Sequence, residues 1–335
     1  MVVCYASHMS AIDLSFTTIK QELPNFIYEK LADFSTQSNS YHHQPEELRG
    51  LIAAKHNIDI DSTSLTAGSD QAIMLLCSLF GRNTHVFTPT YISYSDAKRF
   101  GKFTEHASLK QANYEIGTAK IEGASLIFLA NPNNPAGITT RTRILELVVN
   151  NPKSLVVVDE AYSDFAGESV IEDVSKYNNL IVLRSFSKGY ALAGFRIGYM
   201  IAQPAILNEL VLESTWFNVA YTSVGAAIAA LENETYFTEM RASIVNSRKK
   251  LENTLAQKDC PVIPGYINAT LIKFNDDSTA AMFVDHLEAN NIKVNQGNGA
   301  SNVGLDKSFV RISIGTSEQM NILDEIVNNY RPSVM

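Results

Sequence analysis

One segment of the chain gathers groups that could hold a phosphate beside a reactive amine. It contains Ser185, Ser187, Lys188 and Arg196, and it follows the apolar residues 180–183. Hydroxyl groups and a guanidinium are good ligands for phosphate. A lysine amine beside such a site can form an imine with a phosphorylated aldehyde cofactor. A solvated lysine in a surface loop would explain this segment equally well, so the rest of the chain has to decide.

Three further polar loops each follow a run of residues with strand character. They are Gly68-Ser69-Asp70 after residues 64–66, Asn134 to Gly137 after residues 125–130, and Asp159 to Tyr162 after residues 155–158. A glycine turn that opens a helix can bind an anion, although an ordinary helix cap by Ser69 or Asp70 explains that loop too. Ligands of parallel sheets bind at the carboxyl ends of the strands. The four loops therefore predict one composite site.

The order of the elements predicts the fold class. Strands alternate with helices, which is typical of an α/β fold with a mostly parallel sheet. A long helix over residues 235–257 then leads into a smaller α/β unit. We predict a large domain at residues 46–240 and a small domain formed by residues 1–45 and 241–335. Within this pattern we expect a short strand over residues 13–18 and a helix over residues 91–100.

Composition argues against several classes of partner. The net charge is −8 and the pI is about 5.4, which disfavours nucleic acid and anionic membranes as main partners. No apolar run approaches the ~20 residues that span a bilayer, and no signal peptide is evident. The three cysteines fit neither a zinc spacing nor a disulfide framework, so we expect a cytoplasmic protein. The adjacent His42 and His43 are interpreted as surface residues, and no metal is predicted.

The polar loops meet the demands that pyridoxal phosphate would make if Lys188 held it. Asp159 could keep the ring nitrogen protonated, and Asn134 and Tyr162 could bind the phenolic oxygen. An arginine such as Arg311 could clamp the carboxylate of an amino-acid substrate. Tyr91 could stack on the ring. The phosphate donors would be the backbone at Ser69 and Asp70, the hydroxyls of Ser185 and Ser187, and Arg196. Separately, Asp159 could be a helix cap or an ion-pair partner, and Arg311 could belong to a surface ion pair.

The motifs that carry these residues resemble those of the fold-type-I pyridoxal-phosphate aminotransferases, and within them the class that contains histidinol-phosphate aminotransferase. The resemblance covers roughly residues 41–330. Its strongest parts are residues 131–137 (Asn-Pro-Asn-Asn-Pro-Ala-Gly), residues 158–162 (Val-Asp-Glu-Ala-Tyr), residues 183–196, and residues 310–316 (Val-Arg-Ile-Ser-Ile-Gly-Thr). It implies an enzyme that moves an amino group between an amino acid, or a related amine such as histidinol phosphate, and a 2-oxo acid.

The resemblance also implies roles for single residues. Lys188 would form the internal aldimine and then carry the proton between the substrate and the cofactor. Asp159, Asn134, Tyr162, Tyr91 and the phosphate donors would bind the cofactor as described above, while Arg311 and Asn134 would bind the substrate. Members of this family are typically homodimers, and Tyr41 resembles the tyrosine that such proteins lend to the cofactor phosphate of the neighbouring subunit.

The sequence departs from the family pattern near the expected substrate site. Residues 14–20 stand where an Asn-Glu-Asn-Pro-like segment is usual, and Asn295 stands where histidinol-phosphate enzymes tend to carry an arginine for the substrate phosphate. Ala136 replaces a usual threonine, which should be tolerated. We therefore hypothesise that histidinol phosphate is not the best substrate, unless Lys273 or Lys293 supplies the missing charge.

Three alternatives remain beside transamination. A decarboxylase of the same fold, for example one acting on threonine phosphate, would use the same lysine and aspartate. A non-catalytic regulator of this fold would need a DNA-binding domain, for which the acidic chain gives no sign. A generic nucleotide-binding protein is disfavoured because neither a G-x-G-x-x-G nor a Walker pattern occurs.

Overall fold

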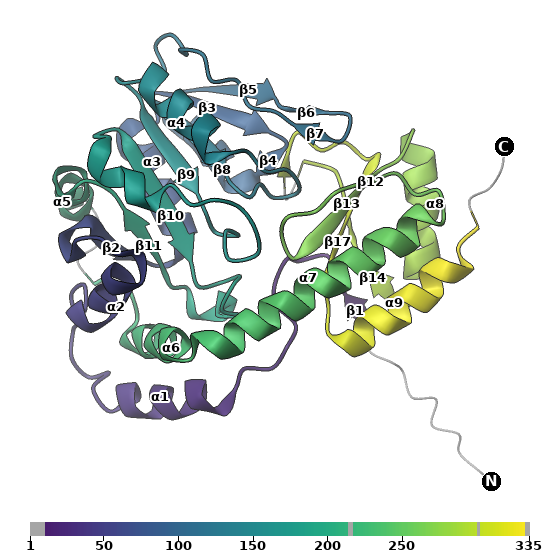
Figure 1. Ribbon diagram of the computed structural model, residues 1–335, viewed down its shortest axis with the longest axis horizontal. Helices are drawn as coiled ribbons and strands as arrows, with labels where there is room; N and C mark the ends of the chain where they lie inside the picture. Colours follow the sequence, from purple (N-terminus) through teal and green to yellow (C-terminus); the bar gives the residue numbers. More distant parts are fainter. Residues whose placement is uncertain (1–10, 214–216, 300–301, 332–335) are drawn as a thin grey trace.

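The computed structural model describes residues 11–213, 217–299 and 302–331. In these residues two separate sheets lie side by side, and the long helix α7 (Glu234–Ala256) runs beneath both of them (Figure 1). The larger sheet and its helices hold the middle of the chain. The smaller sheet is built from the C-terminal part and is joined by residues close to the N-terminus.

The larger sheet has seven strands, of which only β11 runs against the other six. This confirms the expected α/β fold with a mostly parallel sheet. In spatial order the strands are β2 (Thr63–Thr66), β11 (Gly198–Ile201), β10 (Leu180–Ser185), β9 (Leu155–Asp159), β8 (Leu126–Ala130), β3 (Asn83–Thr88) and β5 (Lys102–Ala107). The carboxyl ends of the six parallel strands therefore share one edge, as the polar loops require.

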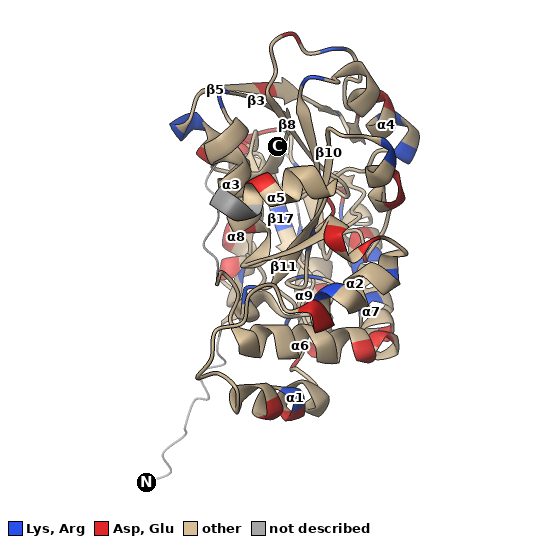
Figure 2. Cartoon of the chain, turned by 90° about the vertical axis from the view of Figure 1, so that its left-hand side faces the viewer, with Lys and Arg blue, Asp and Glu red and all other residues tan. Residues whose placement is uncertain are grey.

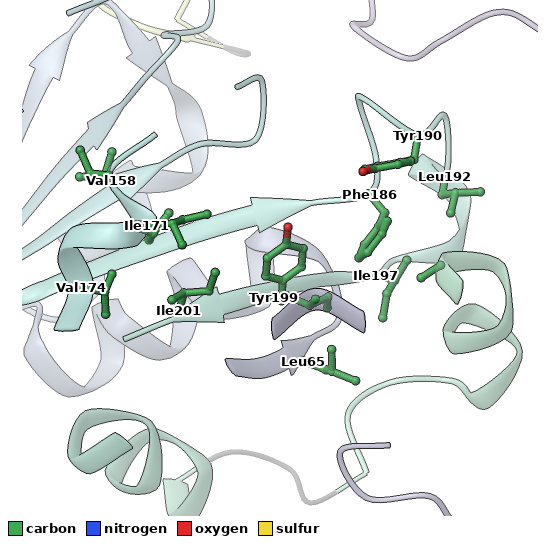
Figure 3. Packing of buried hydrophobic residues seen from close by; sticks show 14 of the residues in the cluster. Leu65, Val158, Ile171, Val174, Phe186, Tyr190, Leu192, Ile197, Tyr199 and Ile201 are labelled. Atoms are coloured by element: carbon green, nitrogen blue, oxygen red, sulfur yellow. The ribbon is translucent and has the colours of Figure 1, made fainter. Parts of the chain in front are cut away.

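Helices cover both faces of the larger sheet because its central strands are apolar on both sides. Val156 and Val158 face one core, and Val157 between them faces the other. Figure 3 shows the first core around β10 and β11, where Phe186 and Tyr199 pack closely. The helices are α1 (Asn25–Ser35), α2 (Glu46–His56), α3 (Gly68–Phe80), α4 (Arg141–Asn150), α5 (Pro204–Glu213) and α6 (Tyr221–Glu232).

The smaller sheet has four antiparallel strands, in the order β12 (Val262–Ile263), β13 (Ala269–Lys273), β17 (Phe309–Ser313) and β15 (Asn295–Gln296). Two capped helices pack on it, α8 (Asp277–Glu288) behind Asp276 and α9 (Ser317–Asn329) behind Thr316. The N-terminal strand β1 (Ile12–Asp13) pairs with β14 (Ile292–Lys293). Residues 12–13 are therefore attached to this smaller unit although they lie far from it in sequence.

Helix α7 links the two cores. Its Phe237 packs in the core of the larger sheet, Ile244 and Leu251 pack in the core of the smaller unit, and Met240 touches both. In contrast, Ile27 and Phe34 of α1 pack against the larger core. The described residues before position 36 therefore contribute to both units, β1 to the smaller and α1 to the larger.

One local expectation was wrong, and a second was confirmed as a helix but of the 3-10 type. The strand predicted over residues 13–18 ends at Asp13, because the Asp13 carboxylate accepts hydrogen bonds from both the backbone and the hydroxyl of Ser15 and turns the chain. The helix predicted over residues 91–100 is the 3-10 helix η2 (Ile92–Arg99), preceded by the two-residue strand β4 (Thr90–Tyr91). Strand β4 pairs with β16 (Asn302–Val303), and β6 (Leu109–Lys110) pairs with β7 (Asn113–Tyr114).

The remaining short elements are the 3-10 helices η1 (Ile60–Ser62), η3 (Ile171–Lys176) and η4 (Ala193–Phe195). Acidic and basic residues are interspersed along the helices, for example along α1 (Figure 2). Among the described residues, no helix combines the length and the apolarity that crossing a membrane would require.

Candidate active site

A cavity of about 420 Å³ lies at the carboxyl edge of the larger sheet. Its volume is in the usual range of a small-molecule site. Every predicted site residue of the four polar loops lines it, together with Tyr91: Ser69, Asp70, Asn134, Asp159, Tyr162, Ser185, Ser187, Lys188 and Arg196. The structure therefore brings together side chains from distant parts of the chain, such as Asp70 and Arg196, which are 126 positions apart.

One end of the cavity is built for an anion. Ser69 and Asp70 stand in the first turn of α3, where backbone N–H groups point outward. Ser185 is the last residue of β10, and Ser187 lies just beyond it. Arg196 Nη2 donates to Asp70 Oδ2 at 2.8 Å, and a Cβ at Gly68 would come within 2.6 Å of that same nitrogen. Gly68, with φ +73°, is therefore required for the approach of the guanidinium.

The Lys188 amine contacts the N-terminal segment of the chain. Its Nζ donates to the backbone oxygen of Thr17 at 3.1 Å and to Thr17 Oγ1 at 3.0 Å. Thr17 Oγ1 also lies 2.8 Å from the hydroxyl of Tyr162. Thr17 is 6% exposed, so these contacts are shielded from solvent.

Asp159 is a buried carboxylate at the end of β9. It accepts hydrogen bonds from the Tyr94 hydroxyl at 2.8 Å and from the Ala161 N–H at 3.0 Å. The Tyr94 ring stacks on Phe128, which fixes the donor. Burial raises the pKa of Asp159 to about 6 despite these donors, and no cation forms an ion pair with it within the described ranges.

Arg311, the predicted ligand of the substrate carboxylate, does not line the cavity but contacts Asn134, which does. It stands on β17, is 4% exposed, and donates to Asn134 Oδ1 and Asn302 Oδ1 at 3.0 Å each and to the Ser15 carbonyl at 2.8 Å. All these acceptors are neutral, and no carboxylate pairs with this guanidinium in the part of the chain that the structure describes. A buried cation of this kind is stabilised when a bound ligand supplies the anion.

Asn134 joins the two sides. Its Oδ1 accepts from Arg311, and its Nδ2 donates to the Tyr162 hydroxyl at 3.3 Å. Asn134 and Tyr162 are 5% and 6% exposed. These contacts connect the cation of the smaller sheet to the cavity in the larger one.

Tyr41 lies apart from the cavity. It is 83% exposed, and its ring stacks on Phe217 with 4.6 Å between centroids. The expected role of Tyr41 concerns a neighbouring subunit, so its position in a single chain does not test that role.

Sequence reasoning did not identify Thr17, Thr18 and Tyr94, which all line the cavity. It also overlooked Asn302, which holds Arg311. For Thr17 and Thr18, the sequence signal was that residues 14–20 differ from the segment usual in the family. For Tyr94, it was the position three residues after Tyr91, one helical turn away.

Comparisons with known proteins identify the family of this chain. The family model for aminotransferase class I and II matches residues 10–326. Histidinol-phosphate aminotransferase 1 of Bradyrhizobium diazoefficiens is 32% identical over 303 residues, which covers 84% of this chain and 81% of that protein. The structure of histidinol-phosphate aminotransferase from Sinorhizobium meliloti in complex with pyridoxal-5'-phosphate has a TM-score of 0.83 at 23% identity, covering 95% and 90% of the two chains.

A decarboxylase is also among the similar structures. The L-threonine-O-3-phosphate decarboxylase from Porphyromonas gingivalis has a TM-score of 0.82 at 25% identity, covering 94% of this chain and 98% of that one. The fold is thus common to both kinds of enzyme, whereas the family match is to aminotransferases.

The chain belongs to the class I and II aminotransferase family. It is a pyridoxal-phosphate-dependent aminotransferase, as the sequence motifs predicted. The residues present fit that cofactor, because a buried carboxylate at Asp159 suits a cationic ring nitrogen and the anion site around Arg196 suits a phosphate.

Proposed function

We propose that this enzyme takes the amino group from an amino acid whose carboxylate binds Arg311 and passes it to a 2-oxo acid. One observation carries the proposal within the described part of the chain. Asp159, a buried anion without a cationic partner, lines the cavity that holds Lys188, and Arg311, a buried cation without an anionic partner, contacts Asn134 of that cavity. Each ion suits one charged part of the reacting molecules, the ring nitrogen and the substrate carboxylate. When bound, the cofactor stores the amino group and accepts the electron pair released at the substrate α-carbon.

The chain's own residues then have distinct tasks in this proposal. Lys188 carries the proton to and from the substrate α-carbon, and Asp159 keeps the ring nitrogen protonated. Asn134 and Tyr162 donate to the phenolic oxygen, and Tyr91 covers the ring. The phosphate is held by the backbone N–H groups of Ser69 and Asp70, the hydroxyls of Ser185 and Ser187, and Arg196. The Asp70 carboxylate orients Arg196 through their ion pair.

We propose in addition that the preferred donor carries no phosphate. Asn295 on β15 is the register partner of Arg311 on β17, so an uncharged amide stands next to the carboxylate-binding residue. The two lysines that could compensate are placed elsewhere, because Lys273 donates to Ser308 Oγ and Lys293 is exposed on β14. Phosphorylated donors, including the histidinol phosphate in the names of the relatives, would lack a clamp here.

A screen of amino donors tests the proposal. Mixing the loaded enzyme with single amino acids should convert its visible absorbance to that of the amine form. The rate of this conversion with histidinol phosphate should be at least about tenfold lower than with the best amino acid. A tenfold difference corresponds to the loss of one charged contact. Asn295→Arg should reduce the difference in rate between histidinol phosphate and the best amino acid. Asn295→Gln is the uncharged control. Release of carbon dioxide without the amine form would instead favour the decarboxylase, and Lys188→Ala, expected to lose more than about 10⁴-fold in rate, is the inactive reference.

The assembly, the domains and the location also remain proposals. We propose a homodimer in which Tyr41 reaches the neighbour's cofactor phosphate, supported by the exposed aromatic pair Tyr41 and Phe217. The division into a large domain at residues 46–240 is supported by Met240, which touches both cores. A cytoplasmic location is supported by Cys77 and Cys260, which are both buried and unpaired.

A further inference from the structure

The Arg311 guanidinium donates to neutral oxygens, and one of these belongs to Asn302 of β16. Asn302 is 1% exposed. Its Oδ1 accepts from Arg311 Nη1 at 3.0 Å, and its Nδ2 donates to the carbonyl oxygens of Asn134 at 3.1 Å and Thr90 at 3.3 Å. An arginine has only donors and a carbonyl oxygen only accepts, so both sides assign the same orientation to the Asn302 amide.

These contacts leave part of the Arg311 guanidinium for a ligand. A guanidinium has five N–H donors. Asn302 and Asn134 both accept from Nη1, and the Ser15 carbonyl accepts from Nη2. The donors that remain are the Nε–H and the second N–H of Nη2, and Nε is buried with no acceptor among the described residues. A buried N–H group without an acceptor is costly, so these two donors suit the two oxygens of a bound carboxylate.

The two asparagine contacts are compatible with a bound cofactor and a bound substrate. Both contacts use Nη1 of Arg311, whereas the donors left for a carboxylate are on Nε and Nη2. Asn134 accepts from Arg311 with its Oδ1, which leaves its Nδ2 as a donor on the cavity side, where it faces Tyr162. Asn302 can therefore hold Arg311 in the working enzyme as well as in the empty chain.

Asn302 also connects Arg311 to the segment that carries Tyr91, the residue proposed to cover the cofactor ring. Asn302 is the register partner of Tyr91 in the β4–β16 pair, and its amide donates to the carbonyl oxygens of Thr90 and Asn134. Its side chain thus lies between the guanidinium and two segments that border the cavity. A long arginine side chain needs such fixed partners to present its donors in one geometry.

A second buried asparagine provides a matched comparison. Asn133 is 0% exposed, and its Nδ2 donates to two backbone carbonyl oxygens at 2.7 and 2.8 Å. Its Oδ1 accepts from the Thr90 hydroxyl at 3.0 Å, and no hydrogen bond joins it to Arg311 among the described residues. Asn133 and Asn302 therefore make the same kinds of contact to backbone, but only Asn302 also holds the guanidinium.

We propose that Asn302 is a positioning residue that makes the site selective for donors with a carboxylate; this inference rests on the proposed function. Asn302 holds Nη1 of Arg311 and so leaves the Nε and Nη2 donors to the substrate carboxylate. Without the Asn302 oxygen, Nη1 lacks one of its acceptors and the guanidinium is no longer held in this orientation. The substrate carboxylate then binds more weakly, whereas the steps that follow binding change little.

The first test compares the best amino-acid donor with the corresponding amine that lacks the carboxylate. Asn302→Leu keeps a similar side-chain size but removes the acceptor. We expect KM for the amino acid to rise about tenfold or more, the effect of one lost hydrogen bond to a charged group, while kcat stays within about threefold. The value of kcat/KM for the amine should change little. Asn133→Leu, the matched control, should change kcat/KM for both donors by the same factor.

The second test needs no cofactor and therefore stands even if the proposed function is wrong. Thermal unfolding of the cofactor-free protein is measured for Asn302→Leu, Arg311→Met and the double variant. Leucine leaves a buried N–H of Arg311 without its acceptor, and this cost disappears once methionine replaces the arginine. Asn302→Leu should therefore lower the midpoint temperature clearly less in the Arg311→Met background than in wild type. Asn151→Leu, which removes a buried asparagine that shares no hydrogen-bond partner with Arg311, should lower it equally in both.

The outcomes separate the role of Asn302 from the proposed function. Equal changes of kcat/KM for both donors in Asn302→Leu, or an undiminished loss of stability in the Arg311→Met background, would overturn the role of Asn302. A diminished loss in a protein that turns over no amino donor would support the contact between Asn302 and Arg311 and contradict the proposed function instead. If Asn302→Leu does not fold, Asn302→Ala with Asn133→Ala gives the same comparison.

Discussion

The two sides of the active site have opposite origins and opposite charges. The side from the larger sheet holds Asp159 at the end of a buried strand, in a loop that follows it directly in sequence. The side from the smaller unit holds Arg311, and the residues around it come from remote parts of the chain, including Ser15 and Asn134. Both ions are buried without a counter-ion among the described residues. In the proposed function, Asp159 is matched to a cofactor that is always the same, and Arg311 is matched to a substrate that differs between enzymes.

This difference explains why the cofactor side of the site can be predicted from local motifs and the substrate side cannot. A cofactor imposes the same charges at the same places, so its ligands recur at fixed strand ends. A substrate side chain imposes no such pattern. We propose that its surroundings in this enzyme are set by residues 14–20, of which Thr17 and Thr18 line the cavity, and by the β15–β17 pair that holds Asn295 and Arg311.

Asp159→Asn removes the buried anion on the larger-sheet side of the active site. We expect it to lower the rate more than a substitution of Arg311 or Tyr41. Without a carboxylate the ring nitrogen loses the partner that keeps it protonated, so the rate of the half-reaction with an amino donor should fall by about 10³-fold. Stopped-flow absorbance of the loaded enzyme measures this rate. A loss smaller than tenfold would contradict the assignment of Asp159.

The same variant has a signature in the cofactor-free protein. The pKa of Asp159 is raised by burial to about 6 in the folded protein, from 3.8, so the folded state binds the proton more tightly than the unfolded state. The stabilising effect of that proton is complete below about pH 4 and disappears as the pH rises through 6. Asp159→Asn has no carboxyl group to ionise, so its stability should not fall between pH 4 and pH 7. At pH 7 its free energy of unfolding should therefore exceed that of wild type by on the order of 3 kcal/mol. Urea unfolding at pH 4 and pH 7 measures the change.

The part of the fold that was predictable consists of strands with a single strong signal. Residues 155–158 and 180–183 are continuous apolar runs, which in an α/β pattern are buried parallel strands, and their following loops had to meet at one edge. Residues 91–100 mislead because 3-10 and α-helices place apolar side chains at similar spacings.

The part that was not predictable depends on contacts between distant segments. Thr17 lies 145 residues from Tyr162 and 171 residues from Lys188 in sequence, and nothing local marks it as a partner of either. Tyr94 was not predicted because nothing in its local sequence indicates a role other than its position after Tyr91. Its contact with Asp159 exists because η2 packs over the carboxyl edge of the sheet.

Arg311→Lys tests the smaller-unit side and should have an intermediate effect. A lysine cannot make the paired contacts of a guanidinium, so kcat/KM for an amino-acid donor should fall by about 10²-fold, mostly through KM. The matched control is the corresponding amine that lacks the carboxylate, whose already low kcat/KM should change little. Equal losses for both donors would mean that Arg311 acts only by supporting Asn134 and Ser15.

Tyr41→Phe concerns the proposed contribution of a neighbouring subunit and should have the smallest effect. The substitution keeps the ring that stacks on Phe217 but removes the hydroxyl proposed to reach the neighbour's cofactor phosphate, so cofactor affinity should weaken about fivefold while the assembly is kept. Tyr41→Ala also removes the stacked ring and should shift the dimer towards monomer in sedimentation experiments. Because Tyr41 is 83% exposed in a single chain, neither change should destabilise the isolated fold by itself. Unaltered cofactor affinity in a Tyr41→Phe dimer would place the hydroxyl outside the neighbouring site and leave the phosphate to the larger-sheet side alone.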